Sequence, residues 1–315
     1  MDTIIRNTVH VLLALALPPL LLGVIGKTKA LFAGRIGPPL LQPYYDLIKL
    51  FRKGSVFSTT TTWVFRAGPV VGLVTAAIAV LLIPLANGIA PVSFTGDLIL
   101  LAYLLGLGRF FTASAALDTG SPFEGMGAAR EVSFACLAEP ALFLGLLVLA
   151  KLSGSLHLAD LVVDGKVQPG ILGSLLGSHW PTAGASLALV LLSWFIVLLA
   201  ENSRIPFDDP NTHLELTMIH EVMVLDHSGP AFGMILYGAA IKLFVFGALV
   251  VRLAIPWATG SPWLDWPIFV GGMLVVAVAI GVVESTMARL RMTQVPILLV
   301  AACLLSAFGV ILVVR

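Results

Sequence analysis

The sequence predicts an all-α integral membrane protein with about eight transmembrane helices. Hydrophobic residues make up 58% of the 315 residues, charged residues only 11%, and the mean hydropathy is +1.02. Soluble domains, in contrast, contain about 25% charged residues. The apolar residues are also collected into runs long enough for a helix to cross a bilayer core, which requires about 20 residues. We therefore expect residues 1–315 to form a single polytopic membrane domain.

Eight apolar runs meet this length requirement. The first contains Pro18 and Pro19, and no small-residue cleavage site follows it, so we expect a retained helix and not a removed signal peptide. No internal repeat is evident, which argues against the inverted-repeat design of many transporters. The predicted spans are 8–26, 67–86, 98–117, 133–152, 184–201, 230–252, 268–286 and 294–314.

Lysine and arginine are distributed unequally between the two ends of these spans. The loops near 27–66, 118–132, 202–229 and 287–293 carry eleven of them, and the opposite side carries four. Cytoplasmic loops of membrane proteins are enriched in Lys and Arg. We therefore predict a multi-pass protein of the cell inner (cytoplasmic) membrane, with these four loops in the cytoplasm and both termini on the outer side.

One predicted loop concentrates the titratable groups of the chain. Residues 201–230, ENSRIPFDDPNTHLELTMIHEVMVLDHSGP, contain three of the six histidines and six of the seventeen carboxylates. The carboxylates are Glu201, Asp208, Asp209, Glu215, Glu221 and Asp226.

The same segment carries signals for a short helix. Asp209 and Pro210 are typical of a helix start, and Ser228-Gly229-Pro230 predicts its end and the entry to the sixth span. On a continuous helix, the histidines at 213, 220 and 227 would share roughly one face. The sequence thus predicts a short amphipathic element at membrane depth that can exchange protons.

Charges inside the spans are the second set of candidates. An ionisable residue at the centre of a bilayer costs about 2.5–3.5 kcal/mol on insertion scales, so it is a functional candidate by default. Glu139 requires a partner, which Arg109 or Lys242 could supply from another helix. Glu284 is either functional or in an interfacial ion pair with Arg289. Glu201 closes the fifth span.

Two basic residues near span ends have a simpler explanation. Lys151 and Arg252 are expected to extend along the apolar surface and place their charges at the membrane boundary.

Several kinds of catalytic site are not supported. His220-Glu221 lacks the second histidine of an HExxH zinc motif, and histidines seven residues apart lie about 10 Å apart along a helix axis. Cys136 and Cys303 lie far apart in apolar runs and are expected to be buried. A formal net charge of +1 gives no indication of nucleic-acid binding. We expect no metal, no redox centre and no catalytic residue in this chain.

Two motifs resemble a known family. GRIGPPLLQPYYDLIKLFRKG (34–54) resembles the first cytoplasmic loop of subunit 1, the H subunit, of respiratory complex I. ENSRIPFDDP (201–210) resembles the E-x-x-R-x-P-F-D-x-P loop of that protein. The stretch DTGSPFEGMGAAREVSFACLAEP (118–140) is closer to the membrane anchor subunit of group 4 membrane-bound nickel-iron hydrogenases, of the formate hydrogenlyase subunit 4 type.

The resemblance implies a function. It implies a non-redox subunit of an oxidoreductase complex that anchors a cytoplasmic arm and couples the redox chemistry of that arm to translocation of protons or sodium ions. The implied partners are hydrogenase large and small subunits, an iron–sulfur protein and antiporter-like membrane subunits. A nickel-iron centre and iron–sulfur clusters are expected in those partners, and no cofactor in this chain.

The resemblance and the membrane-depth charges together give two groups of expected site residues. The expected proton or ion path comprises Arg109, Glu139, Glu201, Glu215, Glu221, Asp226, Lys242 and Glu284. The expected chamber and docking loops comprise Arg35, Asp46, Arg204, Asp208, Asp209, His213, His220 and His227.

Departures from the complex I pattern distinguish between the alternatives. Asp226-His227 stands where complex I has Glu-Tyr, and residues 209–213 replace a more acidic run, which favours the hydrogenase relative. A quinone-chamber subunit of complex I is the first alternative, and a stand-alone ion transporter is the second.

Overall fold

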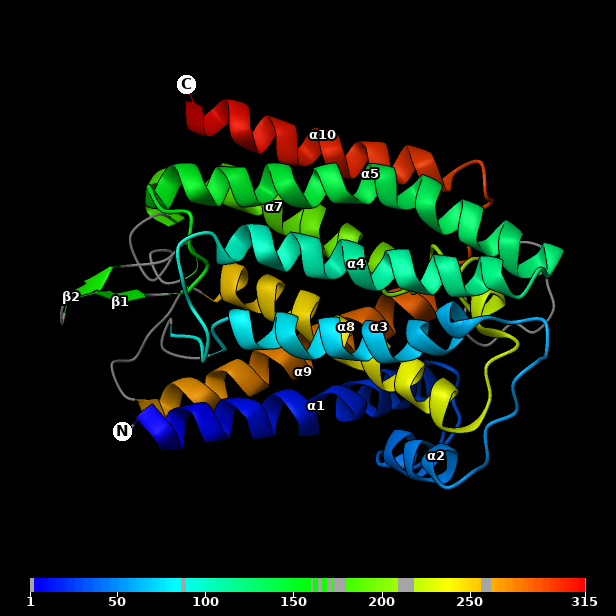
Figure 1. The fold of residues 1–315 in the computed structure, drawn as a ribbon. Helices are drawn as coiled ribbons and strands as arrows, with labels where there is room; N and C mark the ends of the chain where they lie inside the picture. The colour runs from blue at the N-terminus through cyan, green and yellow to red at the C-terminus, as the bar shows by residue number, and fades with distance from the viewer. Residues whose placement is uncertain are drawn as a thin grey trace.

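The chain forms a bundle of long helices that lie side by side (Figure 1). The computed structural model describes residues 3–85, 89–159, 161–163, 166–168, 172, 180–208, 218–255 and 262–314. Within these ranges, eight helices are long and apolar enough to cross a membrane, which confirms the predicted class and all eight predicted spans. They are α1 (Thr3–Phe32), α3 (Trp63–Leu82), α4 (Asp97–Asp118), α5 (Pro122–Ser153), α7 (Trp180–Glu201), α8 (Gly229–Ala254), α9 (Pro262–Thr286) and α10 (Val295–Val314).

Four short elements lie outside the long helices in the described part of the chain. Helix α2 (Gln42–Phe51) follows α1, and the 3₁₀-helix η1 (Glu221–Val224) precedes α8. The strands β1 (Leu161–Val163) and β2 (Lys166–Gln168) pair as an antiparallel hairpin. α2 and η1 lie at one end of the bundle, and the hairpin lies at the other (Figure 1).

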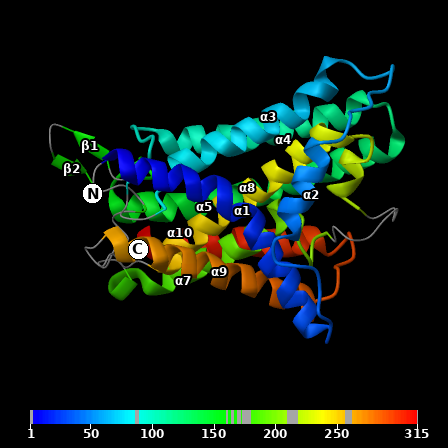
Figure 2. The same ribbon diagram turned by 90° about the horizontal axis from the view of Figure 1, so that it is seen from below.

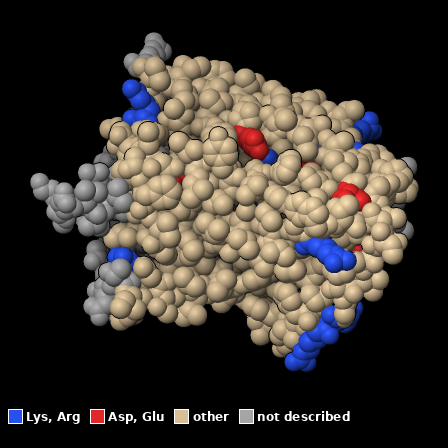
Figure 3. All heavy atoms as spheres, viewed as in Figure 1, with Lys and Arg blue, Asp and Glu red and all other residues tan. Residues whose placement is uncertain are grey.

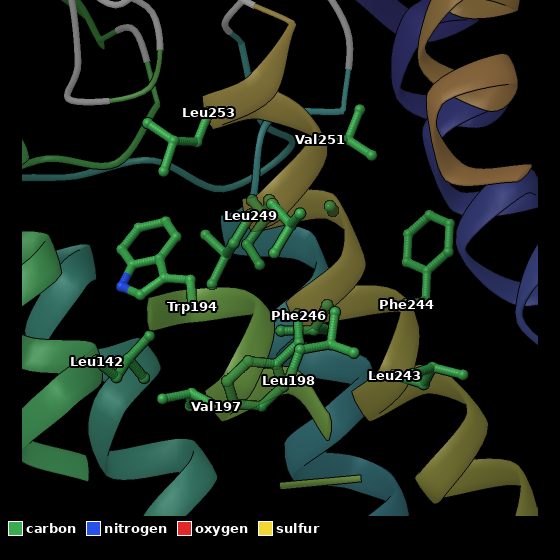
Figure 4. Packing of buried hydrophobic residues seen from close by; sticks show 14 of the residues in the cluster. Leu142, Trp194, Val197, Leu198, Leu243, Phe244, Phe246, Leu249, Val251 and Leu253 are labelled. Atoms are coloured by element: carbon green, nitrogen blue, oxygen red, sulfur yellow. The ribbon is translucent and has the colours of Figure 1, made fainter. Parts of the chain in front are cut away.

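Helix α8 occupies the middle of the bundle. It packs against α1, α3, α7 and α9, and it is apolar almost throughout, so that it is buried on more of its circumference than the other spans. A helix that is hydrophobic all round is typical of such a central position. Figure 4 shows Leu249 of α8 and Trp194 and Leu198 of α7 in the middle of this packing.

Both chain termini lie at the same end of the bundle (Figure 1), as an even number of spans requires. The turns that were predicted to be cytoplasmic lie at the opposite end, together with α2. Figure 3 shows Lys and Arg atoms at both ends of the bundle, including this one, and between the ends a largely uncharged surface with an acidic group near its middle. The sidedness of the two ends stays a prediction from the Lys and Arg distribution.

Three expectations about local structure were wrong. The predicted loop near 118–132 is mostly helical, because Pro122 begins α5 and proline is well suited to the first turn of a helix. Arg252 is buried, and its Nη2 donates to the Leu172 carbonyl at 3.4 Å, because other segments cover the end of the central helix α8. Cys136 is exposed and Cys303 only partly buried, because their helices form the outer part of the bundle.

Helix α1 contains Pro18 and Pro19, and two tyrosines occupy backbone acceptors next to them. Proline has no N–H, so Pro19 leaves the carbonyl of Leu15 without its helical donor. The Tyr237 hydroxyl of α8 donates to this carbonyl at 2.8 Å, and the Tyr44 hydroxyl of α2 donates to the carbonyl of Ala16. Pro19 thus frees the acceptor through which Tyr237 fastens α8 to α1, and the Tyr44 hydroxyl adds a second contact between α2 and α1.

The contact between α5 and α7 gives a stability prediction. A Cβ on Gly145 would lie 2.2 Å from Trp194 Nε1, so Gly145→Ala should lower the free energy of unfolding by about 1–3 kcal/mol through overpacking. Gly271→Ala in α9 is the matched control, since a Cβ there has no heavy atom within 4 Å. Thermal unfolding in detergent should rank Gly145→Ala below both the control and the unmodified chain. Equal melting temperatures for the two variants would contradict this packing.

Candidate functional site

The candidate site is a cluster of charged side chains inside the bundle, and its position depends on the close packing of α3 and α4. A Cβ on Gly68 would lie 2.8 Å from the Cβ of Ala115, and one on Gly108 would lie 2.7 Å from Thr75 Oγ1. Small residues at such contacts allow membrane helices to approach closely. Gly108 immediately precedes Arg109, so this contact fixes the backbone from which Arg109 extends.

Arg109 is the centre of the cluster and contacts three carboxylates. Its Nη2 lies 2.6 Å from both carboxylate oxygens of Glu201, the last residue of α7. Its Nη1 donates to Glu139 of α5, and its Nε lies 3.6 Å from Glu131 of the same helix. Only 9% of the Arg109 side chain is exposed. A buried guanidinium requires such partners, because desolvating an unpaired charge is costly.

Lys242 of α8 completes the cluster. Its Nζ lies 2.8 Å from Glu201 Oε2, so Glu201 receives both cations. Two cations and three carboxylates give the cluster a formal charge of −1. Binding one proton or one monovalent cation would neutralise it. The expectation that Arg109 or Lys242 partners Glu139 is met by Arg109, while Lys242 pairs with Glu201.

Two cavities open onto the cluster from different directions. A cavity of about 110 Å³ is lined by Glu131, Glu201, Lys242 and, from the loop end, His220. A cavity of this size has room for several water molecules, and these charged side chains give them polar partners. A second cavity of about 610 Å³ lies between α4 and α5, with Arg109, Glu139 and Glu201 among its lining residues and apolar side chains around them.

Glu139 is the cluster member that faces outward. Its side chain is 43% exposed, while that of Glu201 is 5% exposed. The cluster therefore connects the interior cavity on one side with the lateral cavity on the other.

A second layer of ion pairs lies nearer the predicted cytoplasmic end. The buried Glu284 of α9 lies 2.8 Å from Lys29 Nζ and 3.4 Å from Arg204 Nη1. Arg289 instead pairs with Asp208 at 2.9 Å. Of the two alternatives for Glu284, the ion pair with Arg289 is therefore wrong, because both side chains turn toward segments that are distant in sequence.

Asp208 organises the backbone of the loop. One carboxylate oxygen accepts the N–H groups of Ile219 and His220 at 3.1 and 3.0 Å, and the other accepts from Arg289. Asp208 is 1% exposed. It therefore holds in place the turn that brings His220 to the cavity.

The helix predicted to carry three aligned histidines is wrong over its described part. Residues 218–228 form a turn, the four-residue η1 and a second turn. His220 lines the smaller cavity, whereas His227 is 8% exposed and stacks on Phe65, with ring centroids 3.9 Å apart. Asp209, His213 and Glu215 lie outside the described residues. The entry to α8 at Ser228-Gly229-Pro230 is confirmed.

The other expected residues lie nearer the surface of this end. Arg35 and Asp226 are exposed, Asp46 is exposed on α2, and Glu221 is half-buried at the start of η1. They are not part of the central cluster. The backbone N–H of Asp226 donates to Glu124 Oε1 at 3.0 Å, which attaches the turn at Asp226 to the start of α5.

Sequence reasoning missed three charged residues of the site region. Glu131 belongs to the cluster, Lys29 pairs with Glu284, and the buried Glu124 fastens the turn at Asp226. A signal for two of them was present, because Glu124, Glu131 and Glu139 are seven and eight residues apart, which places them on one side of a helix. Within the described residues, no three His, Cys, Asp or Glu side chains are grouped to hold a metal ion.

Removing the central cation should destabilise the protein. Arg109→Met leaves Glu201 with Lys242 alone and Glu139 without its partner, so the free energy of unfolding should fall by about 3–5 kcal/mol. The double variant Arg109→Met with Glu201→Gln should recover part of this loss, which denaturant titration in detergent can measure as a double-mutant cycle. Strictly additive effects would show that the two side chains do not interact.

His227 should make stability depend on pH. Burial lowers the pKa of His227 from 6.5 to about 4, so the unfolded chain binds a proton at higher pH than the folded protein does. The free energy of unfolding should therefore fall as the pH decreases from 6.5 to about 4. His227→Phe keeps an aromatic ring next to Phe65 but cannot bind a proton. Its melting temperature, recorded between pH 6.5 and about 4, should therefore lack the decrease that His227 causes. Parallel pH profiles for the two proteins would refute it.

Comparison with known proteins identifies the family of this fold and site. A family model described as NADH dehydrogenase matches residues 6–315. The chain is 32% identical over 301 residues to formate hydrogenlyase subunit 4 of Escherichia coli (strain K12), covering 93% of each protein. It is 32% identical over 283 residues to hydrogenase-4 component C of the same organism, covering 88% of this chain and 85% of the relative.

More distant relatives agree with this assignment. The H subunit of the NADH-quinone oxidoreductase of Rubrobacter xylanophilus is 29% identical over 268 residues, covering 82% of this chain and 77% of the relative. A chain from the membrane-bound sulfane sulfur reductase (MBS), an archaeal respiratory membrane complex, has the same fold, with a TM-score of 0.78 at 23% identity over 98% of this chain and 99% of that chain. The chain therefore belongs to the NADH dehydrogenase family and is close to formate hydrogenlyase subunit 4 and hydrogenase-4 component C.

Proposed function

We propose that this multi-pass membrane protein is the non-redox anchor subunit of an ion-translocating, hydrogenase-type complex in the cell inner membrane. The observation that carries the proposal is the cluster of Arg109, Glu131, Glu139, Glu201 and Lys242 at membrane depth, with a cavity on each side. Ionisable groups inside a membrane mark ion paths and proton relays. The nickel-iron centre and iron–sulfur clusters would belong to hydrogenase large and small subunits and an iron–sulfur protein docked on the cytoplasmic loops.

Coupling would begin at the loop that contains Asp208 and His220. The carboxylate of Asp208 binds the backbone N–H of His220, and the His220 side chain lines the cavity that reaches Glu131, Glu201 and Lys242. A docked arm that shifts this loop would therefore change the distance between His220 and the cluster. Water in the cavity would carry a proton between them, as hydrogen-bonded chains do.

The lateral cavity supports an exit toward other membrane subunits. Glu139 is 43% exposed at the middle of α5, where hydrocarbon is a poor environment for a carboxylate. A transmembrane helix of a neighbouring subunit, such as an antiporter-like protein, would cover it and receive the transferred ion.

The relatives from NADH-quinone oxidoreductase support a complex I role as the second candidate. In that case the complex would depend on quinone.

Co-purification distinguishes the two functions. The chain should be affinity-purified from its native membrane in mild detergent, and the accompanying proteins identified by mass spectrometry and assayed for hydrogen-linked dye reduction. Nickel-iron hydrogenase subunits with hydrogen activity would support the proposal, and NADH- or quinone-reactive subunits would replace it with the complex I function. A chain that purifies alone would contradict both.

Glu139→Gln tests the coupling step in the purified complex. We expect it to retain hydrogen-linked dye reduction, while proton or sodium transport into liposomes falls by about tenfold or more, since a proton-transfer group typically contributes about 10²–10⁴-fold. Asp97→Asn is the matched control. Asp97 is buried at the far end of α4 and accepts the Leu158 N–H at 2.7 Å, a bond that asparagine can also accept. Unchanged transport in Glu139→Gln would remove Glu139 from the path.

A further inference from the structure

Helix α2 differs from the long helices in length and direction. Its ten residues, Gln42–Phe51, are too few to cross a bilayer. It packs against α1 and α8 and lies across their long axes at the periphery of the bundle (Figures 1 and 2). Because the long helices cross the membrane, a helix across their axes runs parallel to the membrane surface.

The side chains of α2 form three faces. At about 100° per residue, Pro43, Leu47 and Leu50 fall on one side, and all three are partly buried. The adjoining face is apolar and exposed. It consists of Leu41 (48% exposed), Tyr45 (57%), Ile48 (51%) and Phe51 (47%).

The third face is polar, and its cationic side chain lies nearer the exposed apolar face than its acidic side chain does. Going round the helix from Tyr45, the next charged side chain is Lys49, and Asp46 follows it; Lys53 lies just beyond the end of the helix, where the chain bends. Arg52 lies between Tyr45 and Ile48 in this projection, and all four charged residues are exposed. Among the described residues, none of the three cations forms an ion pair with a carboxylate. Figure 3 shows Lys and Arg atoms gathered over the part of the surface where α2 lies.

This order matches the layers of a membrane surface. Hydrocarbon suits the four apolar side chains, the phosphate layer suits the cations, and water suits Asp46. Lys and Arg can also lie along apolar surface and place their charge at the headgroups, which accounts for Arg52 on the apolar side. The apolar face lies at the periphery next to membrane-spanning helices, so lipid is favoured over a water-soluble protein as its neighbour.

We propose that α2 is an interfacial helix and that Lys49 on it, with Arg52 and Lys53 immediately after it, binds the phosphate headgroups of anionic phospholipids. Leu41, Tyr45, Ile48 and Phe51 reach into the hydrocarbon beneath those headgroups. The Tyr44 hydroxyl donates to the Ala16 carbonyl of α1 and so links the position of α2 at the membrane surface to that of α1. The inference does not depend on the proposed ion translocation.

Depth measurement tests the position of α2. In a chain with Cys136→Ser and Cys303→Ala, spin labels at Ile48→Cys and Asp46→Cys would be compared within the native complex in nanodiscs. We expect the label at 48 to be relaxed mainly by oxygen, which concentrates in hydrocarbon, and the label at 46 by a water-soluble nickel chelate. Equal access of the chelate to both labels, or exclusion of both reagents from the label at 48 by covering protein, would overturn the proposal.

Lipid selectivity tests the three cations. The native complex would be titrated with phosphatidylglycerol and phosphatidylcholine, and bound lipid counted by native mass spectrometry. Lys49→Gln, Arg52→Gln and Lys53→Gln together should weaken phosphatidylglycerol binding by about fivefold for each cation removed, with little effect on phosphatidylcholine. The control removes three other exposed cations, Arg66, Lys151 and Arg291.

The outcomes separate the possible sources of phosphate. Competition by glycerol phosphate at millimolar concentration would show a site for a free phosphate and not for a lipid, and would overturn the proposal. Equal loss of phosphatidylglycerol in the test and control variants would show attraction by overall charge alone, and would also overturn it. Neither label accessibility nor lipid binding requires hydrogen activity or ion transport. Both measurements therefore remain informative if the proposed coupling function is wrong.

Discussion

Arg109 imposes the constraint around which the interior of this protein is arranged. A guanidinium at membrane depth is tolerated when carboxylates surround it and water or protein replaces its hydration. The three carboxylates that do so come from α5 and α7, so these helices must converge on α4 at one level. Lys242 then brings α8 to the same level through Glu201. The close contact of α3 and α4 through Gly68 and Gly108 follows from the same requirement, since it holds the backbone of Arg109 in place.

The ion pairs nearer the predicted cytoplasmic end serve a different purpose. They join segments that are far apart in sequence, such as Lys29 with Glu284 and Asp208 with Arg289. Asp208 also accepts two backbone N–H groups from the segment that leads to η1. The described residues on either side of positions 209–217 are therefore joined to each other and to the bundle. A protein that docks at this end would act close to His220, which lines the cavity that reaches the central cluster.

Sequence reasoning found the elements of this structure more readily than their pairings. The eight spans follow from the length and hydropathy of each run, which are local properties. The partner of Glu139 was narrowed to two cations but not chosen, because the choice depends on how α4 and α5 pack. An ion pair between Glu284 and Arg289 was one of two alternatives because the two residues are close in sequence, yet each side chain pairs with a residue from a distant segment. The helix expected around His220 was wrong because Asp208 binds the backbone there and holds a turn.

The exposure of Glu139 determines which functions are physically consistent with the fold. A chain that worked alone in a membrane would present this carboxylate, 43% exposed at mid-span, to hydrocarbon across the lateral cavity between α4 and α5. The cluster to which it belongs carries a formal charge of −1, so the two cations of the cluster do not neutralise its three carboxylates fully. A neighbouring transmembrane helix, or an ion in transit, would supply the missing cover or positive charge. Either requirement is easier to meet in a subunit of a larger assembly than in a stand-alone transporter. The relatives named as subunits and components agree with this physical argument.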